Sequence, residues 1–289
     1  MHTRFAKFVN LPELLSMFHA VADVQTADML NLPRPKIAGG RPQIISAPAS
    51  ADLKAFVQSL VGRSEKLRSG GVDPRDDNML KITTEGRKAA LDIRLVNPDA
   101  DSNGETKISR AVAKIHEIWQ RTKPSRLTQL AFCDISTPNP VKFNVYDEIR
   151  NSLIDRGVPE PEIAFIHDAD TDAAKQSLFD SVNAGRVRIL LGSTEKMGAG
   201  TNVQRLLKAL HDLDAPWRPR DIEQRRGRGE RQGNLNDELE LYRYVTNVSG
   251  ARQSPSRTTR RSAPHVGNSA RVAYVRSVLT RSSKSPIQE

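Results

Sequence analysis

Residues 221–233 carry the sequence DIEQRRGRGERQG, and this arginine-rich stretch decides how the rest of the chain is interpreted. Its arginines are Arg225, Arg226, Arg228 and Arg231. If the stretch is helical, Arg228 and Arg231 lie on one face, with Gln224 one turn before Arg228. Guanidinium groups are planar and always charged, so a pair of them suits phosphate oxygens. On its own, such a cluster is also typical of a solvated basic helix end.

A second stretch, residues 189–204, reads ILLGSTEKMGAGTNVQ. An apolar run from Val187 to Leu191 ends here in a small, polar loop that contains glycines. This pattern is typical of a buried parallel strand that carries a functional loop at its carboxyl end.

Together, the two stretches resemble motifs V and VI of the superfamily-two helicases and translocases, and they are closest to the Swi/Snf-type branch. The shared order is an apolar strand, Ser-Thr-x-x-x-Gly-x-Gly-x-Asn, and then Gln-x-x-Gly-Arg-x-x-Arg-x-Gly. The resemblance is specific over about residues 127–246. It implies an α/β fold, a RecA-like parallel sheet with helices on both faces.

The resemblance also implies roles for single residues, because two RecA-like lobes close over ATP in that family. Arg228 and Arg231 would be catalytic arginine fingers on the γ-phosphate, and Gln224 and Gly200 would lie at the nucleotide with them. Four residues would couple the nucleic-acid backbone to the ATP cleft: Ser193, Thr194, Gly198 and Asn202. The alternative is that Thr194 and Gly200 only form a turn and have no role at the nucleotide or the nucleic acid.

The first lobe of the family holds ATP with Mg²⁺ through a Gly-x-x-x-x-Gly-Lys-Ser/Thr loop and an acidic pair. No such loop occurs in this chain, and neither Asp147-Glu148 nor Asp237-Glu238 follows an apolar strand. We therefore expect the second lobe of an ATP-dependent helicase or translocase, present as a truncated or split polypeptide. We expect it to be inactive as an ATP hydrolase until another polypeptide or missing sequence supplies the first lobe.

The chain divides into three parts by its pattern. Residues 1–106 read as a mostly helical segment, similar to the one that joins the lobes in large helicase–methyltransferase proteins of phages and mobile elements. Strands and helices alternate over residues 107–246, which predicts the parallel sheet. Residues 247–289 are rich in Ser and Arg, and we expect a disordered tail.

Periodicity and capping residues place the individual elements. Helices are expected over residues 11–18, 50–67, 84–95, 108–121, 143–156 and 171–182. Strands are expected over residues 44–45, 127–133, 163–166, 187–191, 206–213 and 239–245.

The formal charge of +10 indicates a polyanionic partner, but it is unevenly distributed. The tail holds eight of the Arg and Lys residues against Glu289, a charge of +7, which leaves +3 for residues 1–246. Two interpretations of the tail remain open. It adds salt-sensitive phosphate affinity, or it is the product of translation out of frame.

Other features limit the location and the chemistry. There is no apolar run of roughly 18 residues and no signal-peptide pattern, so we expect a cytoplasmic protein without a membrane partner. Cys133 is expected to be a buried, inert thiol. No metal site is predicted, because His167 and its acidic neighbours are explained by a loop and a helix cap. Trp217 is expected to pack beneath the arginine-rich stretch, with base stacking as the alternative.

Three rival functions remain open at this stage. The first is a non-catalytic fragment that binds nucleic acid, and the second is an unrelated α/β enzyme with a phosphate-bearing substrate. The third is a degenerate remnant without activity. Duplex DNA is a more natural partner than RNA for the Swi/Snf-type branch, but the residues themselves do not decide between the two polymers.

Overall fold

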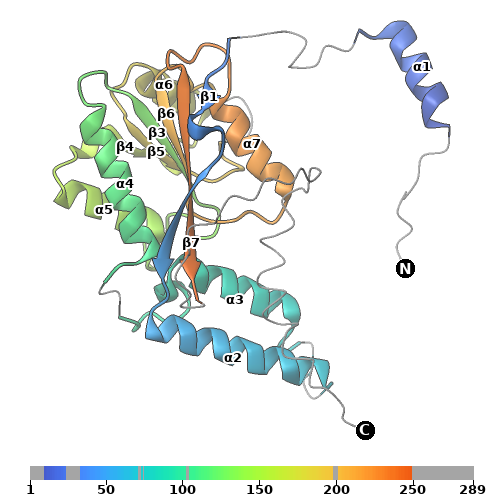
Figure 1. Ribbon diagram of the computed structural model, residues 1–289. Helices are drawn as coiled ribbons and strands as arrows, with labels where there is room; N and C mark the ends of the chain where they lie inside the picture. Colours follow the sequence, from blue (N-terminus) through green and yellow to red (C-terminus); the bar gives the residue numbers. More distant parts are fainter. Residues whose placement is uncertain are drawn as a thin grey trace, which may run out of the picture.

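A parallel sheet forms the centre of the chain in the computed structural model, which describes residues 10–23, 33–70, 73, 75–101, 104–197 and 201–248 (Figure 1). In the described residues the sheet has seven strands in the order β1-β7-β6-β3-β5-β4, and β2 also pairs with β7. The strands are β1 (Lys36–Ile37), β2 (Gln43–Pro48), β3 (Thr128–Phe132), β4 (Ile163–Phe165), β5 (Ile189–Gly192), β6 (Leu207–Asp212) and β7 (Glu238–Asn247). Gly198, Gly200 and the tail beyond residue 248 lie outside the described residues.

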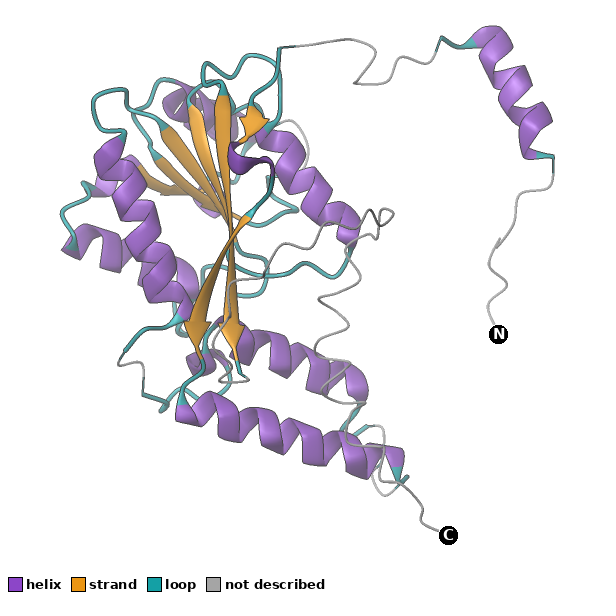
Figure 2. Ribbon diagram, in the orientation of Figure 1, coloured by secondary structure: helices purple, strands orange, loops and turns teal. Residues whose placement is uncertain are grey.

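Helices cover both faces of the sheet, as expected for a RecA-like lobe (Figure 2). Side chains alternate between the faces along a strand, so residues of both parities are buried along the central strands, and most of them are apolar. On β3 and just after it, Ala131 and Cys133 pack against α4 (Lys107–Arg121) and α5 (Val145–Asp155). Leu130 and Phe132 face the opposite side, where α6 (Asp172–Asn183) and α7 (Pro219–Gly229) lie.

Side-chain caps start α2 and α4 within one residue of their predicted starts. The Ser50 hydroxyl accepts a hydrogen bond from the Leu53 backbone N–H at the start of α2 (Ala51–Arg68). Thr106 and Ser109 form a reciprocal capping box at the start of α4. Each cap satisfies backbone donors that lack a partner in the first turn, so these local signals fix the helix starts.

The predicted helix over residues 84–95 is wrong in both bounds. The helix α3 runs from Met79 to Leu91, because the Asn78 side chain accepts from the Lys81 N–H and caps it one turn earlier. Residues Ile93–Leu95 form a separate short 3-10 turn.

The segment before the lobe takes part in the sheet, which the sequence does not indicate. Gln43–Pro48 of β2 pair in parallel with residues 242–247 of β7. Beyond the ends of these two strands, α2 and α3 form a helical hairpin with a small core of their own, to which Leu53 and Ala89 belong (Figure 1). The helix α1 (Leu11–Val21) forms as expected and has no buried residue.

The described helices include none that is both long and apolar enough to cross a membrane.

A polar chain crosses the core between β3, β6 and β7. His211 of β6 is fully buried, and its Nδ1 lies 2.8 Å from the Tyr244 hydroxyl, while its Nε2 lies 3.0 Å from Gln129 Oε1. The Gln129 amide nitrogen donates to the Ile115 carbonyl, so its oxygen accepts from His211 Nε2–H. Nδ1 then accepts from Tyr244, and every polar atom is satisfied with a neutral imidazole.

We predict that this histidine makes the fold acid-sensitive. Burial, with the nearby Lys114 charge, lowers the pKa of His211 to about 3. Below its ordinary pKa of about 6.5, the unfolded chain therefore binds a proton that the native protein does not. The free energy of unfolding should fall with decreasing pH towards pH 3, by up to about 1.4 kcal/mol per pH unit from this group.

Urea unfolding at several pH values between about 4 and 7 measures this slope. The variant His211→Gln should be less stable at neutral pH and should show a smaller slope, because other titrating groups are common to both proteins. Equal slopes in the two proteins would contradict the prediction.

Candidate functional site

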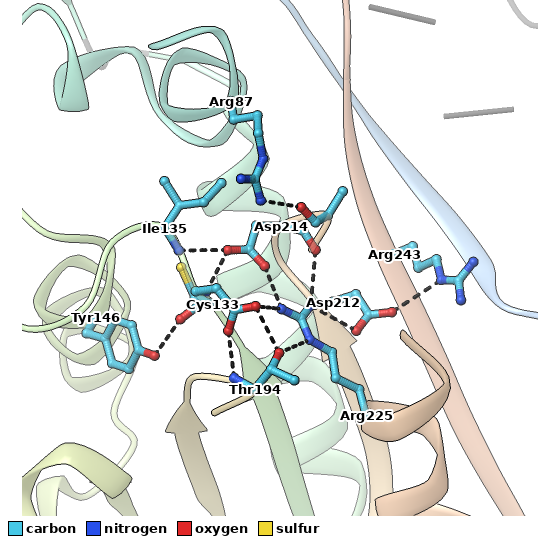
Figure 3. A network of polar contacts seen from close by, with 11 residues as sticks. Arg87, Cys133, Ile135, Tyr146, Thr194, Asp212, Asp214, Arg225 and Arg243 are labelled. Carbon is cyan, nitrogen blue, oxygen red and sulfur yellow. Dashed lines mark hydrogen bonds and ion pairs between the residues drawn. The ribbon is translucent and has the colours of Figure 1, made fainter. Parts of the chain in front are cut away.

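The carboxyl ends of β3, β5 and β6 meet around one arginine of α7, Arg225 (Figure 3). This side chain is 1% exposed, and each of its donor groups has an acceptor. Nε donates to Thr194 Oγ1 at 2.7 Å. Nη2 donates to Asp134 Oδ2 at 2.7 Å and to Asp214 Oδ1 at 2.8 Å. Nη1 donates to Asp212 Oδ1 at 3.4 Å and to the Asp214 carbonyl at 3.1 Å.

We call these five residues the Arg225 cluster: Asp134, Thr194, Asp212, Asp214 and Arg225. A guanidinium has five N–H donors, so this arrangement uses all of them.

The remaining carboxylate oxygens of the cluster tie the loops to one another. Asp134 accepts from the Thr194 backbone N–H at 2.6 Å and from its hydroxyl at 2.9 Å. Asp214 accepts from the backbone N–H groups of Asp134 and Ile135. Asp212 accepts from Arg243 of β7 at 3.2 Å. The loops that follow three neighbouring strands are therefore held in one geometry.

The cluster sets three carboxylates against one guanidinium, and Arg243 beside it adds a second cation. Burial disfavours the charged guanidinium, but the carboxylates of Asp214, Asp212 and Asp134 outweigh it and raise the pKa of Arg225. Burial also raises the pKa of Asp212, against the opposing effect of Arg225 and Arg243. Buried ions of this kind are stable only as a set, because each depends on its partner for compensation.

The expected coupling residues fall into two groups. Thr194 lies inside the Arg225 cluster, where its hydroxyl accepts from Arg225 and donates to Asp134. The Ser193 hydroxyl accepts from the Lys196 backbone N–H at 3.2 Å and starts the turn after β5. Gly198 and Gly200 belong to the part of this loop that is not described.

Arg231 lies beside Asn202, which joins the two sequence stretches at a second point. Its Nη1 donates to Asn202 Oδ1 at 3.1 Å and to the Thr201 carbonyl at 3.2 Å. The expected helical spacing of Arg228 and Arg231 is not formed, because α7 ends at Gly229. Arg231 turns back instead, and its Nε donates to the Gly227 carbonyl at 3.1 Å.

Arg228 is 9% exposed, and within the described residues its buried Nε has no hydrogen-bond partner. Burial, and then the charge of Arg231, lower its pKa. Gln224 is half-buried on the preceding turn of α7. Next to Arg228, a Cβ on Gly229 would lie 2.3 Å from Leu239 Cδ2, so the glycine lets the end of α7 approach the sheet.

The sequence did not indicate that Arg225 and three aspartates form the centre of this site. A signal was present, since Asp134, Asp212 and Asp214 lie at or just after the ends of apolar strands. The expected place of Trp217 is wrong, because it is 52% exposed and carries the Arg87 guanidinium 4.5 Å from its ring centre. Cys133 is buried as expected, and burial raises the pKa of its thiol.

Residues 141–233 match the family described as the helicase conserved C-terminal domain. This part of the chain is similar to helicase C-terminal domains. The matched range contains both the loop after β5 and the whole of α7, and hence the Thr194–Arg225 and Asn202–Arg231 contacts. Among curated proteins, no sequence matches the chain significantly.

Solved structures with a similar arrangement include three helicase or ATPase chains, all of low identity. The DUF1998 helicase MrfA, solved bound to DNA, has 10% identity and a TM-score of 0.37, over 51% of this chain and 19% of that one. The Hef helicase domain of Pyrococcus furiosus has 14% identity and a TM-score of 0.35, over 67% and 35%. The C-terminal part of the Fun30 ATPase domain has 13% identity and a TM-score of 0.46, over 75% and 86%. The chain thus spans well under half of the first two.

We predict that Arg225→Met lowers the free energy of unfolding by about 3–5 kcal/mol, because it leaves Asp134 and Asp214 without their cation and Asp212 with Arg243 alone. Arg226→Ala is the control, since Arg226 is 52% exposed and pairs only with Glu230 in the described chain. The control should change stability by less than about 1 kcal/mol. Chemical denaturation of both variants measures this, and a similar loss in the two would contradict the structural role of Arg225.

Proposed function

We propose that this chain supplies the second lobe of an ATP-dependent DNA helicase or translocase. The observation that carries the proposal is the end of α7, where the buried Arg228 and the loop-bound Arg231 lie next to Asn202. Two guanidiniums, one of them with an unpartnered donor among the described residues, suit the oxygens of a phosphate chain. Gln224 and the loop from Ser193 to Asn202, with Gly198 and Gly200, complete the proposed site.

The nucleotide would be ATP with Mg²⁺, held mainly by a first lobe that another polypeptide or further sequence supplies. ATP would contribute the transferable γ-phosphoryl group. The carboxylates near the site do not suit the metal, because Asp134, Asp212 and Asp214 are already engaged in ion pairs with Arg225 and Arg243. The proposed role of this chain is therefore to donate hydrogen bonds to the nucleotide. Arg228 and Arg231 would stabilise the charge that develops on the phosphate oxygens.

Nucleic acid would reach the site through the loop after β5. Arg231 donates to Asn202 and Thr201 of this loop, and Arg225 donates to Thr194. A displacement of the loop by bound duplex DNA would thus move the contacts of Arg225 in α7 and of Arg231 just after it. Movement of the loop that contacts the nucleic acid would in this way change the position of the proposed arginine finger Arg231.

A non-catalytic nucleic-acid-binding role is the competing proposal, and the charge distribution favours it. Residues 247–289 hold a formal charge of +7 out of +10, so most of the attraction for phosphates lies outside the lobe. In that case, the lobe arginines would only grip the polymer.

We predict that the chain alone hydrolyses no ATP, with or without duplex DNA, and that Arg231→Ala and Arg226→Ala bind duplex DNA equally well. Both variants lose one positive charge, so the comparison isolates the position of Arg231. With a first lobe present, Arg231→Ala should reduce hydrolysis by about 10³–10⁵-fold, since a finger acts on the transition state. A phosphate-release assay and fluorescence anisotropy measure these quantities.

Two results would contradict the proposal. DNA-stimulated hydrolysis by the chain alone, abolished in Arg231→Ala, would mean that it holds the nucleotide by itself. A selective loss of DNA affinity in Arg231→Ala, with no effect on hydrolysis when a first lobe is added, would favour the non-catalytic role.

A further inference from the structure

An open pocket of about 540 Å³ lies between α3 and the loops that follow β3 and β6. Its walls include Arg87 and Lys88 of α3, Trp217 and Arg218 of the loop before α7, and Asp134 of the Arg225 cluster. The pocket thus joins the segment before the lobe to the carboxyl edge of the sheet. None of the motif residues Ser193, Thr194, Asn202, Gln224, Arg228 and Arg231 lines it.

Trp217 forms a fixed aromatic wall of this pocket. The Arg87 guanidinium lies 4.5 Å from the ring centre, and its Nη2 donates to the Ala215 carbonyl at 2.7 Å. Figure 3 shows Arg87 reaching down towards the loop that contains Asp214. A cation covers one part of the ring, yet the residue is 52% exposed, so aromatic surface remains open to solvent. An exposed indole held in this way is preorganised to stack on another flat group.

The charge around the ring is positive. Arg87, Lys88 and Arg218 line the pocket against Asp134 and Asp221. The Asp134 carboxylate already accepts hydrogen bonds from Thr194 and Arg225, and the three cations of the lining outnumber its two carboxylates. The remaining balance favours an anionic ligand. A flat group together with a phosphate is the chemistry of a nucleotide in a polymer strand.

We propose that this pocket binds an unpaired nucleotide of a single-stranded nucleic acid, with its base stacked on Trp217 and its flanking phosphates on Lys88 and Arg218. The proposal rests on the proposed nucleic-acid function and extends it, because it adds a site to which α3 contributes. It selects a single strand, since the bases of a duplex are paired and stacked on each other. Asp134 contacts both the pocket and Thr194, so an occupied pocket adjoins the coupling loop.

Anisotropy titrations of the full chain with a fluorescently labelled oligothymidylate, and with a duplex of equal length, test this site. Trp217→Leu removes the stacking surface without a change of charge, whereas Trp217→Tyr retains an aromatic ring. Leu235→Ala is the control, because Leu235 is also exposed (66%) but precedes β7 at the opposite, amino-terminal edge of the sheet. The basic tail contributes equally in every variant.

We expect Trp217→Leu to weaken oligothymidylate binding by about 5- to 100-fold, while Trp217→Tyr and Leu235→Ala stay within about threefold of the unchanged protein. Duplex binding should be equal in all four proteins. Oligothymidylate should also quench the fluorescence of Trp217 in the unchanged protein; Trp119, the other tryptophan, is 6% exposed and is shielded.

Equal oligothymidylate affinities for Trp217→Leu and the unchanged protein would overturn the pocket proposal and leave the proposed function standing if duplex DNA still binds. An equal loss on both polymers would also overturn it, since the residue would then not select an unpaired base. The failure of all four proteins to bind either polymer would overturn both proposals.

Discussion

The buried guanidinium of Arg225 is the interaction on which the rest of the site depends. A charge in this position is costly unless every donor finds an acceptor, and its five donors do so on Asp134, Thr194, Asp212 and Asp214. These acceptors come from the ends of three neighbouring parallel strands. The hydrogen bonds and ion pairs that offset the desolvation of this charge therefore hold the loops after β3, β5 and β6 and the helix α7 together as one unit.

This unit gives the lobe a rigid base for two arginines of different character. Arg225, near the middle of α7, fixes this helix to the edge of the sheet, and Gly229 lets the end of the helix approach Leu239. Arg228 and Arg231 follow at that end, one buried with an unpartnered donor in the described chain and one bonded to the loop at Asn202. Rigid support of this kind suits groups that must meet a phosphate chain in a fixed geometry.

The sequence predicted the strands of the lobe because buried parallel strands are continuous apolar runs, and it predicted the start of α2 at its Ser50 cap. It did not predict the pairing of β2 with β7, because an apolar pattern does not name a partner far along the chain. It singled out Arg228 and Arg231 and gave Arg225 no role, since burial depends on tertiary context. The ion pairs that bury Arg225 and the contact between Trp217 and Arg87 both join residues far apart in the chain, which a local pattern does not show.

Hydrogen exchange at the Thr194 amide tests the central claim most directly, because this N–H donates to Asp134 only while Arg225 holds that carboxylate in place. Exchange followed by mass spectrometry should show a protected Thr194 amide in the unchanged protein and in Arg226→Ala. In Arg225→Met, under conditions where the sheet amides remain protected, the Thr194 amide should exchange faster by at least about tenfold. Unchanged protection in Arg225→Met would contradict the account, since the loop would then keep its geometry without the guanidinium.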